Sequence, residues 1–171
     1  MRARSLLALA LSGVVVVACS EQPPTASSDG PAFNGGRGPV VNFVSVGSDD
    51  LCKPDFAAGC DANASLVARK YADGSVAGEW HDNLKFGFDK VWKIHIKIDC
   101  LFVDGNQAWV SGVVTDGPFT GAPAIERVAD NGTSANEPAD QYSFIRLSYT
   151  TCEQAPPYEL FDMIDGQVKV W

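Results

Sequence analysis

The sequence predicts an all-β fold, either an antiparallel sandwich or a small up-and-down barrel of about seven to eight short strands. Its segments alternate apolar and polar residues, most clearly between Trp92 and Cys100. Turn dipeptides such as Asp73-Gly74 and Asp104-Gly105 separate these segments at strand-length intervals. No long window shows the 3.6-residue apolar period of a helix without an interrupting glycine or proline.

The first strands are expected as follows. Val40–Val46 is apolar and β-branched, as strands commonly are. Ala64–Tyr71 and Ser75–Asp82 flank Asp73-Gly74, which predicts a hairpin. In the next strand, Trp92–Cys100, one face carries Trp92, Ile94, Ile96, Ile98 and Cys100, and the other carries Lys93, His95, Lys97 and Asp99.

The second half of the chain continues the pattern. Gln107–Thr115 alternates again, and Ala124–Ala129 forms a weaker strand. Gln141–Tyr149 is rich in β-forming residues, and Gly166–Trp171 makes the last strand. Tyr158–Ile164 is compatible with a helical turn or with an eighth strand.

The N-terminus has the pattern of an export signal, with Arg2 and Arg4 before an apolar run. That run, Leu6–Ala18, has 13 residues, whereas a membrane-spanning helix needs about 20. Val16–Cys19 resembles the lipobox of bacterial lipoproteins. The resemblance implies a signal peptide over residues 1–18 and an acylated Cys19 that anchors the protein to a bacterial membrane, facing the periplasm or the exterior. An ordinary signal peptide that ends near a cysteine is the alternative.

Residues 19–37 are rich in proline, glycine and small polar residues, and Phe33 is their only large apolar side chain. Such a segment cannot bury enough surface to offset its ordering entropy, so we expect a lipidated flexible tether. Residues 38–171 then form a single β domain. Removal of Arg2 and Arg4 changes the net charge from −8 to −10, which argues against nucleic-acid binding.

Of the five cysteines, four remain when Cys19 is assigned to lipid. An even remainder in an oxidising compartment predicts disulfides, and we favour Cys52–Cys60 and Cys100–Cys152. Cys100 follows Ile98 on the apolar face, so its sulfur is expected to point inward. This pairing would bring distant strands together by closure or a Greek-key return. Free thiols and a metal site are the alternatives, although the cysteine spacings match no zinc motif.

Three turn-and-strand stretches carry a second resemblance: Tyr71–Gly78, Ile98–Gly112 and Val128–Gly132. Together they resemble a small β domain of exported bacterial proteins that sometimes follows choice-of-anchor modules. The match would cover residues 64–171. The resemblance implies an extracytoplasmic all-β module without known catalytic residues.

Both histidines lie on polar strand faces. His81 is two residues from Glu79, and His95 lies on another strand between Lys93 and Lys97. If these strands were neighbours, two imidazoles and a carboxylate could bind a transition metal. A solvated sheet face is the favoured interpretation, because the lysines disfavour a cation. His81 and Glu79 are therefore candidate ligand contacts, and we expect no metal and no cofactor.

Three further features of the sequence each allow a functional interpretation. Oxygen-bearing side chains that suit Ca²⁺ crowd one loop, but without EF-hand spacing; they are Asp130, Asn131, Glu137 and Asp140. Trp109 lies opposite Val110, so it is either an exposed ligand contact or is packed under a loop. Ser111 lacks the first glycine of a G-x-S-x-G motif and lies inside a strand, so no hydrolase is expected.

These patterns predict a non-enzymatic lipoprotein of the cell envelope, serving as a binding or structural β module. Its expected partners are the membrane, through Cys19, and an envelope protein or glycan. A barrel that carries a small apolar ligand and a carbohydrate-binding module that uses Trp109 are the alternatives.

Overall fold

The structure is a computed structural model that describes residues 37–49, 61–86, 90–132 and 137–171. The signal peptide of residues 1–18, Cys19, all of the tether except Arg37, and the Cys52–Cys60 pair lie outside these residues. The lipid anchor and the first disulfide therefore stay predictions.

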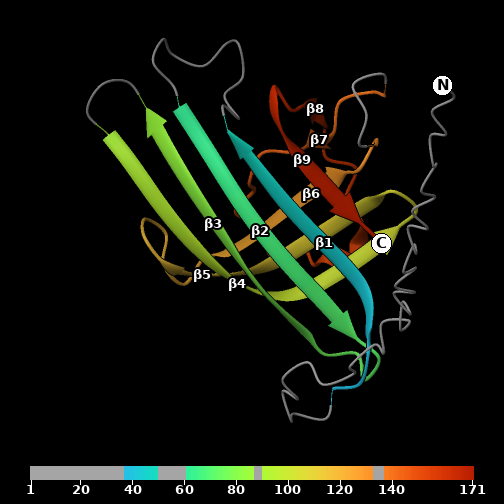
Figure 1. The fold of residues 1–171 in the computed structure, drawn as a ribbon. Coiled ribbons are helices and arrows are strands. Elements are labelled where there is room, and N and C mark those ends of the chain that lie inside the picture. The colour runs from blue at the N-terminus through green and yellow to red at the C-terminus, as the bar shows by residue number, and fades with distance from the viewer. Residues whose placement is uncertain (1–36, 50–60, 87–89, 133–136) are drawn as a thin grey trace, which may run out of the picture. The chain divides into compact units, whose positions relative to one another are not determined.

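The described residues form a single antiparallel sheet that curls into a half-barrel (Figure 1). The all-β prediction is confirmed. The strands of the sheet lie in the order β8-β7-β6-β5-β4-β3-β2-β1-β9. Their bounds are β1 (Val40–Asp49), β2 (Asp61–Tyr71), β3 (Val76–Phe86), β4 (Lys90–Asp104), β5 (Gln107–Asp116), β6 (Pro123–Ala129), β7 (Gln141–Tyr142), β8 (Phe161–Asp162) and β9 (Asp165–Val170), and a 3₁₀ turn, η1, spans Cys152–Gln154.

The segment predicted as a strand over Gln141–Tyr149 is mostly irregular. Only β7 pairs regularly, and one isolated bridge joins Ile125 to Arg146. The side chain of Ser143 accepts a hydrogen bond from the Arg127 backbone N–H at 2.8 Å. A side chain thus takes the place of a ladder carbonyl, and the regular pairing ends there. Tyr158–Ile164 contains β8 and no helical turn.

The curl of the sheet depends on two glycines in one cross-strand row. Gly78 and Gly112 both pair with Ile98, from opposite sides. A Cβ at either glycine would collide with a backbone carbonyl of the neighbouring strand, that of Val67 or Lys97. The glycines therefore allow the close approach of strands that a sharply curled sheet needs.

The core fills the inner face of this half-barrel, where even-numbered residues of β2 and β3 point. Six of its large side chains are each at most 2% exposed; they are Trp80, Leu66, Ile94, Ile96, Ile98 and Leu101.

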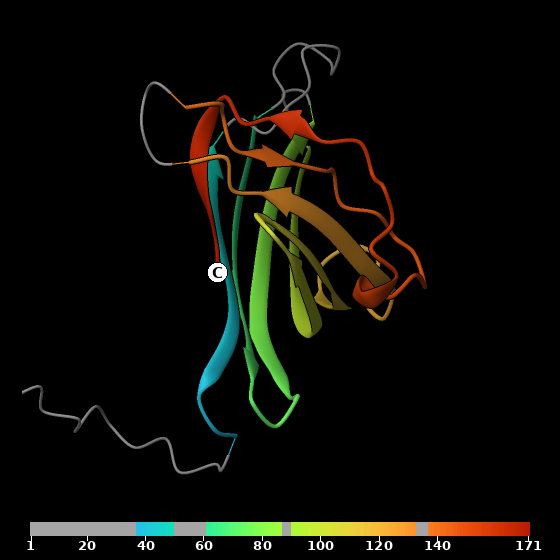
Figure 2. The same ribbon diagram turned by 90° about the vertical axis from the view of Figure 1, so that its right-hand side faces the viewer.

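The last strand returns to the first, and Figure 2 shows β9 (red) beside β1 (cyan). The backbone N–H groups of Val168 and Val170 in β9 donate to side chains from the segment between β6 and β7. The acceptors are Asp140 Oδ2 at 2.6 Å and Asp130 Oδ2 at 3.0 Å. Two carboxylates thus connect β9 to the segment that joins β6 and β7.

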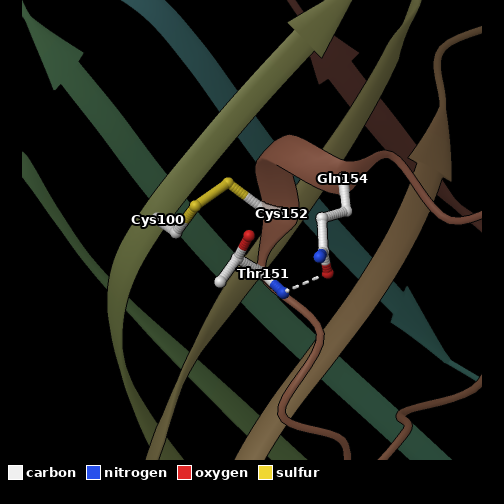
Figure 3. Close-up of a disulfide and its surroundings, with 4 residues drawn as sticks. All are labelled: Cys100, Thr151, Cys152 and Gln154. Carbon is white, nitrogen blue, oxygen red and sulfur yellow. Dashed lines mark hydrogen bonds between the residues drawn. A yellow bond between two sulfur atoms is a disulfide. The ribbon is translucent and has the colours of Figure 1, made fainter.

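The disulfide between Cys100 and Cys152 is present, with a Cα–Cα distance of 5.9 Å (Figure 3). The expectation that the Cys100 sulfur points inward is wrong. A bulge between Ile98 and Cys100 exchanges the two faces of β4, so Leu101 enters the core. Cys100 therefore lies on the outer face of the sheet. There it meets η1, and no Greek-key return is needed for the pair.

Candidate functional site

An open groove lies on the outer face of β2, β3 and β4, with a volume of about 930 Å³. Outward-facing side chains of regular antiparallel strands line it, so its shape is held by ladder hydrogen bonds. The polar and charged side chains of the lining are Arg37, Arg69, Tyr71, Glu79, His81, His95, Lys97 and Thr115. We call this surface the outer groove.

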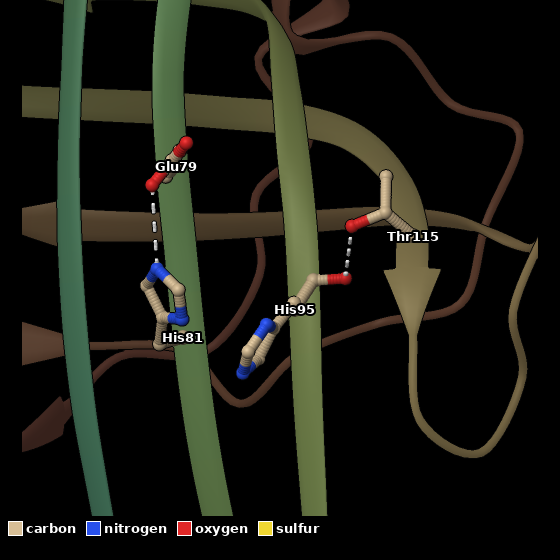
Figure 4. A network of polar contacts seen from close by, with 4 residues as sticks. All are labelled: Glu79, His81, His95 and Thr115. Atoms are coloured by element: carbon tan, nitrogen blue, oxygen red, sulfur yellow. Dashed lines mark hydrogen bonds and ion pairs between the residues drawn. The ribbon is translucent and has the colours of Figure 1, made fainter.

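The centre of the outer groove is a histidine pair. His81 of β3 and His95 of β4 are direct cross-strand partners, and their ring centroids lie 4.3 Å apart at an interplanar angle of 69°. Figure 4 shows the two rings close together on neighbouring strands. The condition on which the sequence-based metal hypothesis depended, that these strands are neighbours, is therefore met.

Two further contacts frame the pair. Glu79 Oε2 lies 3.5 Å from His81 Nε2, with the Glu79 side chain 80% exposed and the His81 side chain 41% exposed. On the other side, the Thr115 hydroxyl donates to the backbone carbonyl of His95 at 3.2 Å (Figure 4). The structure thus brings together two of the candidate ligand contacts, His81 and Glu79, and adds His95.

Positive charge gathers along the outer groove although the chain is acidic. The cationic residues of its lining are Arg37, Arg69 and Lys97, against the single carboxylate of Glu79. Lys93, which is exposed on the same face of β4, lies two residues before His95. The chain as a whole carries a net charge of −8. The groove is therefore a local attractor for anions on a protein that otherwise repels them.

The third candidate contact, Trp109, lies elsewhere. It is 5% exposed, and its Nε1–H donates to the Pro156 carbonyl at 2.9 Å. The Arg127 guanidinium lies 5.2 Å from its ring centroid. Trp109 is thus packed under the segment that follows η1, which was one of the two outcomes expected for it. It cannot be the exposed aromatic of a carbohydrate site.

The loop considered for calcium uses its carboxylates for structure. Asp140 Oδ1 accepts from the Asn131 N–H at 2.7 Å, and Asp130 Oδ1 accepts from the Gly132 N–H at 3.2 Å. The second oxygen of each carboxylate bonds to β9, as described above. These backbone contacts account for both aspartates.

Sequence reasoning missed an acidic cluster inside the half-barrel. Asp82, Glu126 and Tyr142 are 6%, 5% and 4% exposed. Burial raises the pKa of Asp82 to about 7. Burial and the nearby Asp82 charge raise the pKa of Glu126 well above its ordinary value, and burial with both carboxylates raises the pKa of Tyr142 to about 12. The sequence did contain a signal for the burial of Asp82. Asp82 lies two residues after Trp80 in the same strand, so both side chains point to the same face of the sheet.

Comparisons with protein family models, with curated proteins and with solved structures find no match to this chain. Within the described residues, no helix has the length and apolar character needed to cross a membrane. In the same part of the chain, no three or more His, Cys, Asp or Glu side chains group to hold a metal ion.

Proposed function

We propose that this protein is a non-enzymatic, lipid-anchored binding module of the bacterial cell envelope, and that the outer groove binds an anionic ligand. The observation that carries the proposal is the placement of Arg69 and Lys97, with Arg37, around a histidine pair on a rigid sheet face. A protein of net negative charge presents three cationic side chains there. The export signal and the lipobox resemblance support the location in the envelope.

Two alternatives have less support. A carrier barrel needs interior space, whereas large side chains such as Trp80, Ile94 and Ile96 fill the inner face. A carbohydrate module based on Trp109 loses its aromatic platform, since that ring is covered.

Binding of a soluble polyanion tests the proposal. The untagged protein is titrated with fluorescent dextran sulfate, and with neutral dextran as the ligand control. The double variant Arg69→Gln/Lys97→Gln should bind about tenfold more weakly, because two cations leave the groove. The matched double variant Arg146→Gln/Lys169→Gln removes the same charges from exposed positions outside the groove.

We expect this control to bind like the wild type and all binding to weaken as salt rises. Equal losses in the two double variants would show that net charge alone drives binding, and would contradict a specific role for the groove.

A further inference from the structure

His81 and His95 are the only two histidines of the chain, and they lie opposite one another across β3 and β4. Neutral imidazole is the commonest protein ligand for divalent zinc, copper and nickel. We propose that this pair binds such a metal ion when the ion arrives as an anionic chelate, an inference that rests on the proposed anion-binding function of the outer groove.

The ring geometry suits two ligands of one ion. Metal–nitrogen bonds of about 2.0–2.1 Å place two adjacent ligand nitrogens about 3 Å apart. The centroids of His81 and His95 are already 4.3 Å apart and their planes are strongly inclined. Binding of one ion by both rings then requires reorientation of the two side chains, while the strand pairing of β3 and β4 keeps them opposite one another.

Glu79 completes a familiar arrangement around His81. Its carboxylate lies 3.5 Å from Nε2, which leaves Nδ1 as the metal-binding atom of that ring. A carboxylate that holds the second nitrogen orients a ligating histidine and raises its basicity. In Figure 4 Glu79 lies on the side of His81 away from His95, as this role requires.

The surrounding charges decide the form in which the metal binds. Lys93 and Lys97 flank His95 on the same face of β4, and Arg69 lines the groove nearby. These cations repel a bare hydrated metal ion. Within the described residues, the pair also lacks a third protein ligand of the His, Cys, Asp or Glu type. An anionic chelate supplies both missing parts, since it brings oxygen donors for the metal and negative charge for the basic rim.

The binding step exchanges ligands without redox change. Each neutral imidazole nitrogen displaces one water from the metal, and the chelator keeps its remaining positions. A suitable probe is Ni²⁺–nitrilotriacetate, which has a net negative charge and a pair of exchangeable waters.

Isothermal titration of the full, untagged chain with this probe tests the inference. The wild type should bind one chelate per chain. His81→Gln and His95→Gln should each weaken binding at least about tenfold, because one of two metal–nitrogen bonds is lost. With Cu²⁺–nitrilotriacetate, which carries the same net negative charge as the nickel probe, electron paramagnetic resonance should detect two imidazole nitrogens in the wild type and one in each variant. Unchanged affinity in both glutamine variants would overturn the inference.

Dextran sulfate binding separates this inference from the proposed function. Dextran sulfate binding that requires Arg69 and Lys97, without chelate binding at the histidines, would overturn the metal site alone. Chelate binding that requires the histidines but ignores the Arg69→Gln/Lys97→Gln change would overturn the anion-binding function, and with it the role of the basic rim.

Discussion

Asp140 and Val168 are joined by a hydrogen bond of 2.6 Å from the backbone N–H of β9 to the carboxylate Oδ2. The residues are 28 positions apart, and the bond connects the last strand to the segment that precedes β7. The other oxygen of Asp140 accepts from the Asn131 N–H. One buried side chain thus satisfies two backbone donors that a neighbouring strand would otherwise serve.

Asp140→Ala should destabilise the fold by about 3 kcal/mol, because it leaves two backbone N–H groups without an acceptor. Urea denaturation monitored by tryptophan fluorescence measures the change. Asp104→Ala, at an exposed position at the end of β4, is the matched control and should change stability by about 0.5 kcal/mol or less. Equal midpoints for the two variants would refute the structural role given to Asp140.

Asp82 should make stability fall as pH rises. Its pKa is about 7 in the folded protein against an ordinary value of 3.8. Between these values the folded state binds more protons than the unfolded state, so stability is lost as pH increases. The shift corresponds to about 4 kcal/mol at 1.36 kcal/mol per pKa unit. Asp82→Asn should remove this part of the pH dependence.

Denaturation at pH 4, 6 and 8 measures the effect, with Asp104→Asn as the exposed control. Glu126 has a raised pKa of its own, so some decline with pH should persist in Asp82→Asn. A variant whose stability falls as steeply as that of the wild type would show that Asp82 is not the titrating group.

The disulfide should contribute strongly to stability. It links residues 52 positions apart, and the chain-entropy model assigns about 4 kcal/mol to a loop of this size. The Cys100→Ser/Cys152→Ser double variant should lose an amount of this order in urea denaturation. It should also free the segment above Trp109, which a rise in the rate of proteolysis would report. Reduction that leaves the wild-type midpoint unchanged would contradict the pairing.

The lipid anchor has a test that is independent of the groove. Mass spectrometry of membrane fractions should find an acylated peptide that begins at Cys19. Cys19→Ala should abolish acylation and release the protein from the membrane fraction. A mature chain that starts at another residue would remove the lipoprotein prediction.

Strand positions could be predicted from the sequence because alternation is a local signal. The segment Trp92–Ile98 keeps its predicted faces in β4. The exchange at Cys100 could not be predicted, since a bulge inserts one residue without a compositional mark. The Cys100–Cys152 pair was still correctly chosen. An even number of cysteines predicted disulfides, and the assignment of Cys52 and Cys60 to a local loop left Cys100 to pair with Cys152, a choice that did not depend on strand faces.

The histidine pair is a feature that local sequence patterns do not predict. Both rings were placed on polar faces, but their alignment depends on the register between β3 and β4, which pairs His81 with His95 and Phe86 with Lys90. A shift of a single residue in the connection would separate the rings. The register between two strands depends on the packing of the whole inner face. The residue pattern of one strand therefore does not predict it.

Nuclear magnetic resonance of the imidazole protons tests the central claim most directly, that His81 and His95 form one binding site in the outer groove. The chain has two histidines, so only two ring spin systems appear. We predict a nuclear Overhauser cross-peak between the rings, consistent with their 4.3 Å centroid separation. Both systems should shift together, with one saturation curve, on titration with diamagnetic Zn²⁺–nitrilotriacetate. Rings without a cross-peak, or rings that stay unshifted while other signals move, would contradict the account.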